Sequence, residues 1–319
     1  MTSRTRIGAA IGLASLLGSL ALAACASVDV QVPATAHDAP VIEIDDVRLF
    51  YALYDANGGR PTAEQLQRDY LDRGSAGLRI FANARNTTAA RIAQAVAARP
   101  ALYTEARRCV AMLPRVRERA GVALRAMRRL YPEARLPPIT IVIGRGRPMA
   151  IGSPATGVQI GLESLCSASF LNPNIEDLFV RVIAHEYAHV QQAPSLVDGQ
   201  NLTVLQASVM EGAAEFVTEL TTGDIGYAYL HRLTAGRERE IETRFVADMD
   251  KTDLSDWLFN TTPEQPRDLG YWVGYRIAKA YYRNARDKSR ALREILQLEA
   301  GDVRAFLARS GWRPGMTLQ

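Results

Sequence analysis

The chain has 319 residues, of which 48% are hydrophobic and 23% are charged. This composition excludes a disordered, a collagen-like and a multi-span membrane protein, because each of these requires a strong compositional skew. A formal net charge of +4 and an aromatic content of 7% do not favour a nucleic-acid-binding surface, so we expect no nucleic-acid partner.

The first 25 residues have the organisation of a bacterial export signal. Two arginines precede residues 7–22, an uncharged run that is shorter than the roughly 20 residues of a membrane-spanning helix. Residues 22–25 are Leu-Ala-Ala-Cys, which resembles the cleavage motif of bacterial lipoproteins. We therefore expect residues 1–24 to be a signal peptide and Cys25 to carry the lipid that holds the mature chain on a membrane.

Two alternatives remain open for this segment: an ordinary signal peptide with a coincidental cysteine, and an uncleaved anchor. Residues 25–44 are rich in Ala, Val and Pro without a helical period, so we expect a flexible tether there. The residue after Cys25 is Ala26 and not Asp, the pattern of outer-membrane lipoproteins in bacteria with two membranes. The expected location is therefore the outer membrane, with the protein facing the periplasm.

Residues 45–136 form a predicted N-terminal helical region. Apolar spacing and capping residues predict a helix over residues 41–55, a helix start at residues 62–65, and a helical stretch over residues 89–131 broken at Pro100 and Pro114. Six arginines lie between residues 115 and 129. They are either a contact for an anionic surface such as lipid headgroups or a solvated helix face, and the second interpretation is favoured because arginine is the common base of this chain.

The remaining residues, 137–319, mix short strands with long helices. Strands are predicted over residues 139–143 and 157–161, joined by a mobile connection, and helices over residues 174–192, 204–222, 270–283 and 291–307, the last broken near Gly301. Cys109 and Cys166 are the two cysteines left after Cys25. In an oxidising compartment they form either a disulfide or two buried thiols, and the sequence leaves both open.

The helix predicted over residues 174–192 contains the sequence His185-Glu186-Tyr187-Ala188-His189. Residues four apart lie one turn apart on one helix face, so His185 and His189 can bind one tetrahedral metal ion. Glu186 projects to the side, where its carboxylate can act on a water molecule beside the metal rather than bind the metal. The chain has only four histidines, so a chance match to this motif is improbable.

Zinc requires a third protein ligand, and Glu211, Glu215 and His231 are the candidates downstream. Glu211 and Glu215 share a face of the next predicted helix, in the sequence Glu-Gly-Ala-Ala-Glu-Phe. One of these carboxylates can bind the metal while the other hydrogen-bonds the far nitrogen of a ligand histidine. Exposed glutamates without a metal are the alternative, which is weakened by the apolar residues that flank them.

These two motifs together resemble the gluzincin metallopeptidases, which include thermolysin and the zinc aminopeptidases. The resemblance implies that His185, His189 and Glu211 bind one Zn²⁺ ion per chain, that Glu186 is the catalytic base, and that Glu215 supports a ligand histidine. The later sequence Gly-Tyr-Trp-Val-Gly-Tyr-Arg-Ile, residues 270–277, is similar to an element of the zinc-dependent protease family called domain of unknown function 2268. This second resemblance spans residues 139–282. The glycine-rich motif of the aminopeptidases is absent, so nothing implies recognition of a free amino terminus.

The resemblance implies an α+β fold that is mostly helical: a zincin-like catalytic domain with a small β-sheet packed on the helix that carries the two histidines. We expect a lipid-anchored zinc endopeptidase of the cell envelope, in which Glu186 assists the attack of a zinc-activated water on protein or peptide substrates. Tyr271 and Tyr275 are the candidate donors to the developing oxyanion, with His231 as the alternative, and residues 158–161 are the candidate strand for pairing with substrate. The competing hypothesis is a non-catalytic zinc-binding envelope lipoprotein with a role in assembly or partner binding.

Overall fold

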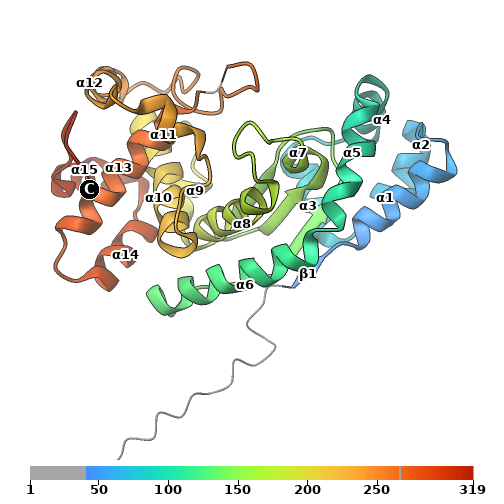
Figure 1. Ribbon diagram of the computed structural model, residues 1–319, viewed down its shortest axis with the longest axis horizontal. Helices are drawn as coiled ribbons and strands as arrows, with labels where there is room; N and C mark the ends of the chain where they lie inside the picture. The colour runs from blue at the N-terminus through green and yellow to red at the C-terminus, as the bar shows by residue number, and fades with distance from the viewer. Residues whose placement is uncertain (1–40, 266, 319) are drawn as a thin grey trace, which may run out of the picture. The chain divides into compact units, whose positions relative to one another are not determined.

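The computed structural model describes residues 41–265 and 267–318, so the predicted signal peptide, Cys25 and most of the predicted tether lie outside the described residues. The described chain is mostly helical with one small sheet (Figure 1).

Its strands are β1 (Ile42–Glu43), β2 (Ile139–Val142), β3 (Ala150–Ser153) and β4 (Gly157–Gly161). Its first helices are α1 (Asp45–Ala56), α2 (Ala63–Leu66), a π-helical turn (Gln67–Leu71), α3 (Ala76–Ala84), α4 (Ala89–Ala98), α5 (Pro100–Val110) and α6 (Leu113–Leu130). After β4 come α7 (Leu162–Cys166), α8 (Ile175–Gln191), α9 (Pro194–Val197), α10 (Val204–Thr222), α11 (Tyr229–Thr234), α12 (Glu238–Asp248), α13 (Leu269–Asn284), α14 (Lys288–Leu296), a 3₁₀ turn (Ala300–Asp302) and α15 (Val303–Ser310).

The N-terminal helices begin and end where local chemistry predicts. Thr62 and Gln65 form the predicted capping box at the start of α2, each side chain bonding the backbone N–H of the other. Pro100 and Pro114 lie in the first turns of α5 and α6, because a proline lacks the N–H that a helix interior requires. The predicted breaks are therefore confirmed, although the first helix begins at Asp45 because residues 42–43 join the sheet.

The four strands lie in the order β1-β2-β4-β3. β1, β2 and β4 run parallel, and β3 pairs antiparallel with β4. The connection predicted to be mobile between residues 144 and 156 therefore contains a strand, β3. Its sequence, Ala-Ile-Gly-Ser, has too few β-branched residues to predict a strand locally, and its extended conformation depends on pairing with β4. Because β4 is paired on both sides, it has no free edge for a substrate, and the predicted role of residues 158–161 in substrate pairing is wrong.

Helix α8 is central to the described part of the chain. The sheet packs on it through β3 and β4, α6 packs along it, and α10 lies against it, with α13 packed on α10 (Figure 1). This arrangement confirms a small sheet on the histidine-bearing helix. Among the described residues, no helix is both long enough and apolar enough to cross a bilayer.

The N-terminal helical region is joined to the rest of the described chain by several kinds of contact. β1 extends the sheet beside β2, and Cys109 of α5 forms a disulfide with Cys166 of α7. On α6, Arg119 and Arg115 bind Glu176 in the first turn of α8, with 2.9 Å from Arg119 Nη1 to Glu176 Oε1. Residues 45–136 and 137–318 thus pack in one compact unit.

Candidate metal centre and catalytic cavity

The residues at the two ends of helix α8 fix where the helix begins and ends, and so fix the position of the two histidines. Asn174 caps it by accepting a hydrogen bond from the Asp177 N–H at 3.1 Å, and Glu176 and Asp177 place negative charge in the first turn. The helix ends at Gln191, and Gln192 is extended before Pro194. His185 and His189 thus lie in the last two turns, facing α10.

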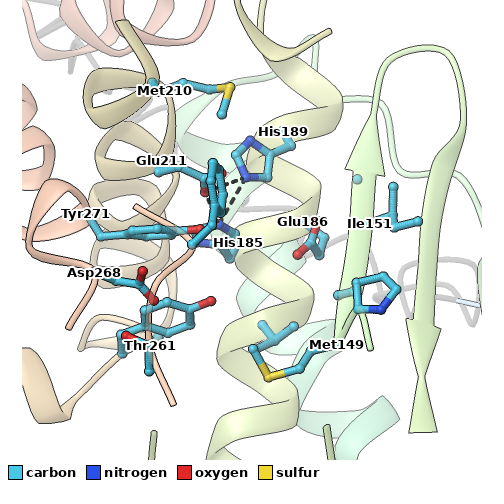
Figure 2. A pocket seen from close by; sticks show the side chains of 18 of the residues that line it. Met149, Ile151, His185, Glu186, His189, Met210, Glu211, Thr261, Asp268 and Tyr271 are labelled. Carbon is cyan, nitrogen blue, oxygen red and sulfur yellow. Dashed lines mark hydrogen bonds and ion pairs between the residues drawn. The ribbon is translucent and has the colours of Figure 1, made fainter. Parts of the chain in front are cut away.

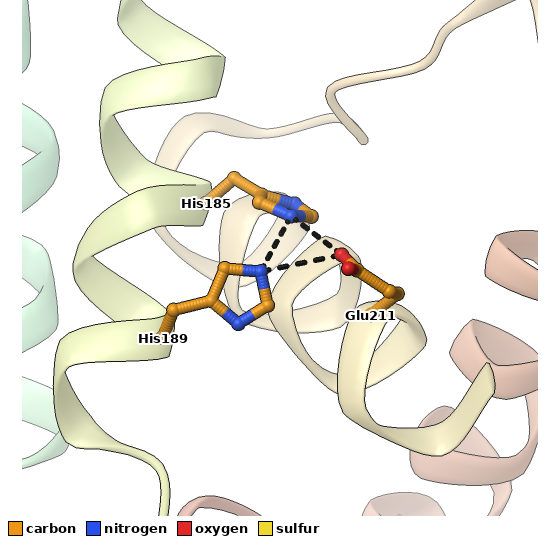
Figure 3. Close-up of side chains that lie close together, drawn as sticks. All are labelled: His185, His189 and Glu211. Atoms are coloured by element: carbon orange, nitrogen blue, oxygen red, sulfur yellow. Dashed lines mark hydrogen bonds and ion pairs between the residues drawn. The ribbon is translucent and has the colours of Figure 1, made fainter. Parts of the chain in front are cut away.

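The structure brings His185, His189 and Glu211 together in a buried cluster (Figure 3). The two Nε2 atoms are 3.0 Å apart, and Glu211 Oε2 lies 3.2 Å from each of them. Of the residues proposed to bind metal, these three converge on one point. The described residues contain no other group of three or more potential ligands of this kind.

The other ring nitrogens, the Nδ1 atoms, each lie beside an oxygen acceptor. His189 Nδ1 lies 2.7 Å from Oε1 of Gln192, whose amide is oriented by donating its Nε2 hydrogen to the Met210 carbonyl at 2.7 Å. His185 Nδ1 lies 3.1 Å from Oε1 of Glu215, a close approach that is not aligned as a hydrogen bond. An acceptor oxygen thus lies beside each Nδ1, so a metal ion bound at the cluster would be held by Nε2 with the hydrogen on Nδ1.

Three potential ligand atoms, the two Nε2 atoms and Glu211 Oε2, therefore converge on one point. A cation at that point, either a proton or a metal ion, stabilises the arrangement. Two imidazoles and one carboxylate are a donor set that catalytic zinc uses, with a further coordination position left for water or substrate. The residues of this cluster thus fit a zinc ion.

The electrostatics of the cluster also favour positive charge. Burial opposes protonation of His185, but the carboxylates of Glu211 and Glu215 outweigh burial and raise its pKa well above the ordinary value. The pKa of His189 is raised in the same way, against burial, by Glu211. In turn, burial opposes ionisation of Glu211, yet the two histidines hold its pKa below the ordinary range.

Glu215 is fixed by the chain that follows α10. Its Oε2 accepts the backbone N–H of Gly226 at 2.6 Å, and a Cβ atom at Gly226 would lie 3.0 Å from Oε1. The residue is almost fully buried, with 1% of its surface exposed. Glu215 therefore faces Nδ1 of His185, whereas Glu211 faces Nε2 of the same ring.

Glu186 lies on the side of α8 that faces the sheet, between the imidazole pair and β3 (Figure 2). A Cβ atom at Gly152 of β3 would lie 2.8 Å from Glu186 Oε2, so β3 approaches this carboxylate as closely as a glycine allows. Burial raises the pKa of Glu186, against the charges of His189 and His185. A carboxylate with raised proton affinity can act as a general base.

These side chains line a cavity of about 920 Å³. Residues 149–152, most of them in β3, line one side of it, and Tyr271 lies on the opposite side (Figure 2). Tyr227 also lines the cavity. The centroids of the Tyr271 and Tyr227 rings lie 6.2 and 6.4 Å from that of His185. Phe259, with 63% of its surface exposed, also lines this cavity.

Comparison with protein families gives a match over residues 168–304, to the family described as predicted Zn-dependent protease, domain of unknown function 2268. This segment is therefore similar to that family. No curated protein and no solved structure matches the chain.

The protease-family segment contains the three converging ligands, Glu186, Glu215 and the tyrosines of the cavity wall. The structure gives different positions to the two tyrosines that were predicted to stabilise an oxyanion. Tyr271 lines the cavity, whereas the Tyr275 hydroxyl accepts a hydrogen bond from Lys279 at 2.8 Å and does not line it. His231, the alternative donor, pairs with Asp224 at 2.9 Å and also lies outside the cavity lining. Of these candidates, Tyr271 alone remains near the cluster.

Two residues of the same segment act at the site without having been predicted from sequence. Gln192 follows His189 by three residues, a spacing that places it one turn further along the helix direction, so its contact could have been predicted from that spacing. Tyr227 lies in the connection after α10, in no motif, and only the tertiary fold brings it beside His185.

Proposed function

We propose that this protein is a zinc-dependent endopeptidase that hydrolyses protein or peptide substrates. The match to a family of predicted zinc-dependent proteases supports hydrolysis of peptide bonds. The observation that carries the proposal is the convergence of two imidazoles and one carboxylate beside Glu186 in a cavity. When bound, zinc supplies a Lewis acid that polarises the substrate carbonyl and lowers the pKa of water.

The chain's own residues supply the proton transfers and the orientation of substrate. Glu186 accepts a proton as water attacks the peptide carbon, and it returns that proton to the leaving nitrogen as the C–N bond breaks. Tyr271 is the protein donor placed to stabilise the oxyanion beside the cluster. The edge of β3 not paired with β4 borders the cavity, so an extended peptide can add to β3 as a further strand.

The proposal extends to the cell envelope, on the basis of the sequence alone. The lipoprotein-type signal ending at Cys25 supports export and attachment by acyl chains, with the outer membrane as the proposed location. A disulfide between Cys109 and Cys166 is consistent with an oxidising compartment outside the cytoplasm.

The test is the variant Glu186→Gln, which preserves the shape of the side chain but cannot accept the proton. We expect zinc content to remain about one ion per chain and cleavage of a peptide library to fall on the order of 10²- to 10⁴-fold. Elemental analysis and mass spectrometry of cleavage products measure the two quantities. Glu118→Gln, at an exposed position on α6, is the matched control and should cleave like the parent. Zinc binding with no cleavage that depends on Glu186 would instead support the non-catalytic zinc-binding lipoprotein.

A further inference from the structure

Three arginines line the catalytic cavity from outside the family-matching segment. Arg85 follows α3, and Arg145 and Arg147 lie in the connection between β2 and β3. Arg145 and Arg147 also line an adjoining hollow of about 630 Å³, together with Arg91 and Arg99. The cavity that contains Glu186 therefore has a strongly basic wall next to β3.

The backbone of this wall is held in place from beneath. Glu163, which is fully buried, accepts hydrogen bonds from the N–H groups of Gly144 at 3.1 Å and Gly146 at 2.8 Å. Arg99 donates to the Arg145 carbonyl at 2.7 Å, and Arg145 Nη2 donates to the Arg85 carbonyl at 3.2 Å. These contacts join the backbone segments that carry Arg85, Arg145 and Arg147, so the three guanidinium groups extend from a backbone that is held in place.

Within the described chain this wall forms no ion pair, although the charge of Arg85, with those of the two histidines, opposes the rise that burial causes in the pKa of Glu186. The side chains of Arg85 and Arg147 make no hydrogen bond or ion pair with any described residue, and Arg145 Nε is buried without a partner. Burial and the neighbouring cations Arg147 and Arg91 lower the pKa of Arg145. By contrast, Arg115 and Arg119 of α6 are both paired with Glu176.

The acidic groups of the same cavity are already engaged. Glu211 contacts both histidines, and Glu215 is held by Gly226 and His185. Asp268 accepts the backbone N–H of Asn260 at 2.9 Å. Glu186 is the remaining carboxylate and forms no ion pair with these arginines, so their guanidinium groups are free to pair with an anionic group of a ligand in the cavity.

We propose that Arg85, Arg145 and Arg147 form a subsite that binds a carboxylate of the substrate peptide near the bond to be cleaved. This inference rests on the proposed peptidase function and names its substrate class. Gly152 lies against Glu186, and Arg147 precedes Gly152 by five residues. At about 3.3 Å per residue in an extended peptide, the recognised carboxylate lies within about five residues of the cleaved bond. Its source is an Asp or Glu side chain or the free carboxyl terminus of the peptide.

The first test compares cleavage preferences of the parent with those of the double variant Arg85→Gln, Arg147→Gln. Both side chains are exposed and form no hydrogen bond or ion pair with a described residue, so their replacement should leave unfolding unchanged. The probes are short randomised peptide libraries with free or amidated carboxyl termini, and mass spectrometry maps every cleaved bond. We expect the parent to prefer Asp or Glu over Asn or Gln about tenfold in kcat/KM at one position, and the variant to lose that preference.

Matched variants make the result specific to this wall. Arg117→Gln with Arg129→Gln removes the same charge from the exposed face of α6 and should keep the acidic preference. Arg147→Glu should shift the preference at the same position towards Lys. If amidation of the carboxyl terminus removes the preference while internal Asp or Glu has no effect, the recognised group is the terminal carboxylate.

A binding measurement separates this inference from the proposed function. Zinc-loaded Glu186→Gln protein is titrated with fluorescent peptides that differ only by Asp or Asn, at low and high salt. Tighter binding of the Asp peptide, lost in the Arg85→Gln, Arg147→Gln background and weakened by salt, supports the subsite even if no cleavage is found. Cleavage that depends on Glu186 but shows no acidic preference, with equal binding of the two peptides, would overturn the subsite and leave the peptidase function intact.

Discussion

Gln192 shows how one side chain outside the metal cluster controls a ligand within it. Its amide joins the His189 ring to the Met210 carbonyl, one residue before Glu211, so it links the last turn of α8 to the turn of α10 that carries the third ligand. Hydrogen bonds of this kind orient a ligand histidine and raise its basicity.

We predict that Gln192→Ala weakens zinc binding about 10- to 100-fold, because His189 Nδ1 loses its acceptor and the ring is free to rotate. Competition with a chromogenic chelator measures the affinity. Gln192→Glu retains an acceptor for the Nδ1 hydrogen and should weaken zinc binding less than Gln192→Ala. Equal zinc affinity in Gln192→Ala and the parent would show that the hydrogen bond does not support the ligand.

At the residue scale, the sequence was informative where chemistry is local. His185, Glu186 and His189 lie within five positions, and helix geometry alone places the two imidazoles together. Glu211 lies 22 positions further on, and its convergence required the resemblance to a known family. Tyr271 and Tyr275 were equivalent in the sequence, because both lie on one apolar helix. Only the rotation of α13 against α10 distinguishes the tyrosine in the cavity from the one beside Lys279.

At the scale of elements, glycines set the distance between the helices that build the site. A Cβ atom at Gly212 of α10 would lie 2.0 Å from the Tyr275 nitrogen, and one at Gly274 of α13 would lie 1.6 Å from the Ser208 carbonyl oxygen. The two backbones are therefore in direct contact. This contact gives a structural reason for the glycines in both sequence motifs, since they let α13 bring Tyr271 next to Glu211 on α10.

Gly274→Ala is predicted to push α13 away from α10 and to lower the free energy of unfolding by about 2–3 kcal/mol. Zinc affinity should fall as well, because Glu211 moves with Gly212. Denaturant unfolding and chelator competition report the two effects. Gly301→Ala is the matched control: a Cβ atom there meets nothing within 4 Å, so a change within about 0.5 kcal/mol is expected. An unchanged unfolding midpoint in Gly274→Ala would contradict the close approach of the helices.

Long helices with caps were predictable from sequence, whereas β3 was not. α8 and α10 carry their own start signals in Asn174 and Thr203, whose side chains accept backbone N–H groups of the first turn. β3 has no such signal, since its four residues become a strand only by pairing with β4. This non-local dependence explains why the candidate edge for substrate pairing was predicted on β4, whereas the unpaired edge beside the cavity belongs to β3.

At the scale of the whole described chain, the N-terminal helices support the α8 helix and the sheet from outside the family-matching segment. Arg119 lies 2.9 Å from Glu176, and Arg115 also pairs with it, at the start of α8. Hydrogen bonds from Arg119, against a smaller effect of burial, lower the pKa of Glu176. The interpretation of the arginine-rich segment as a membrane contact is therefore weakened for these two residues, which are occupied within the protein.

The disulfide between Cys109 and Cys166 is the covalent part of this support. It joins α5 of the N-terminal region to α7, which follows the sheet, across a sequence separation of 57 residues. Closing a loop of that length restricts the unfolded chain and is expected to contribute about 4 kcal/mol to the free energy of unfolding. The sequence could not decide between a disulfide and two thiols, because the pairing depends on how α5 packs on α7.

We predict that reductant lowers the unfolding midpoint of the parent, and that the double variant Cys109→Ser, Cys166→Ser unfolds at the lower midpoint with or without reductant. Thermal and denaturant unfolding measure both. Because neither cysteine lines the catalytic cavity, cleavage that depends on Glu186 should persist in the double variant at temperatures where it stays folded. A parent whose midpoint does not respond to reductant, and whose peptide map shows no peptide linking the two cysteines, would mean that α5 and α7 are held by packing alone.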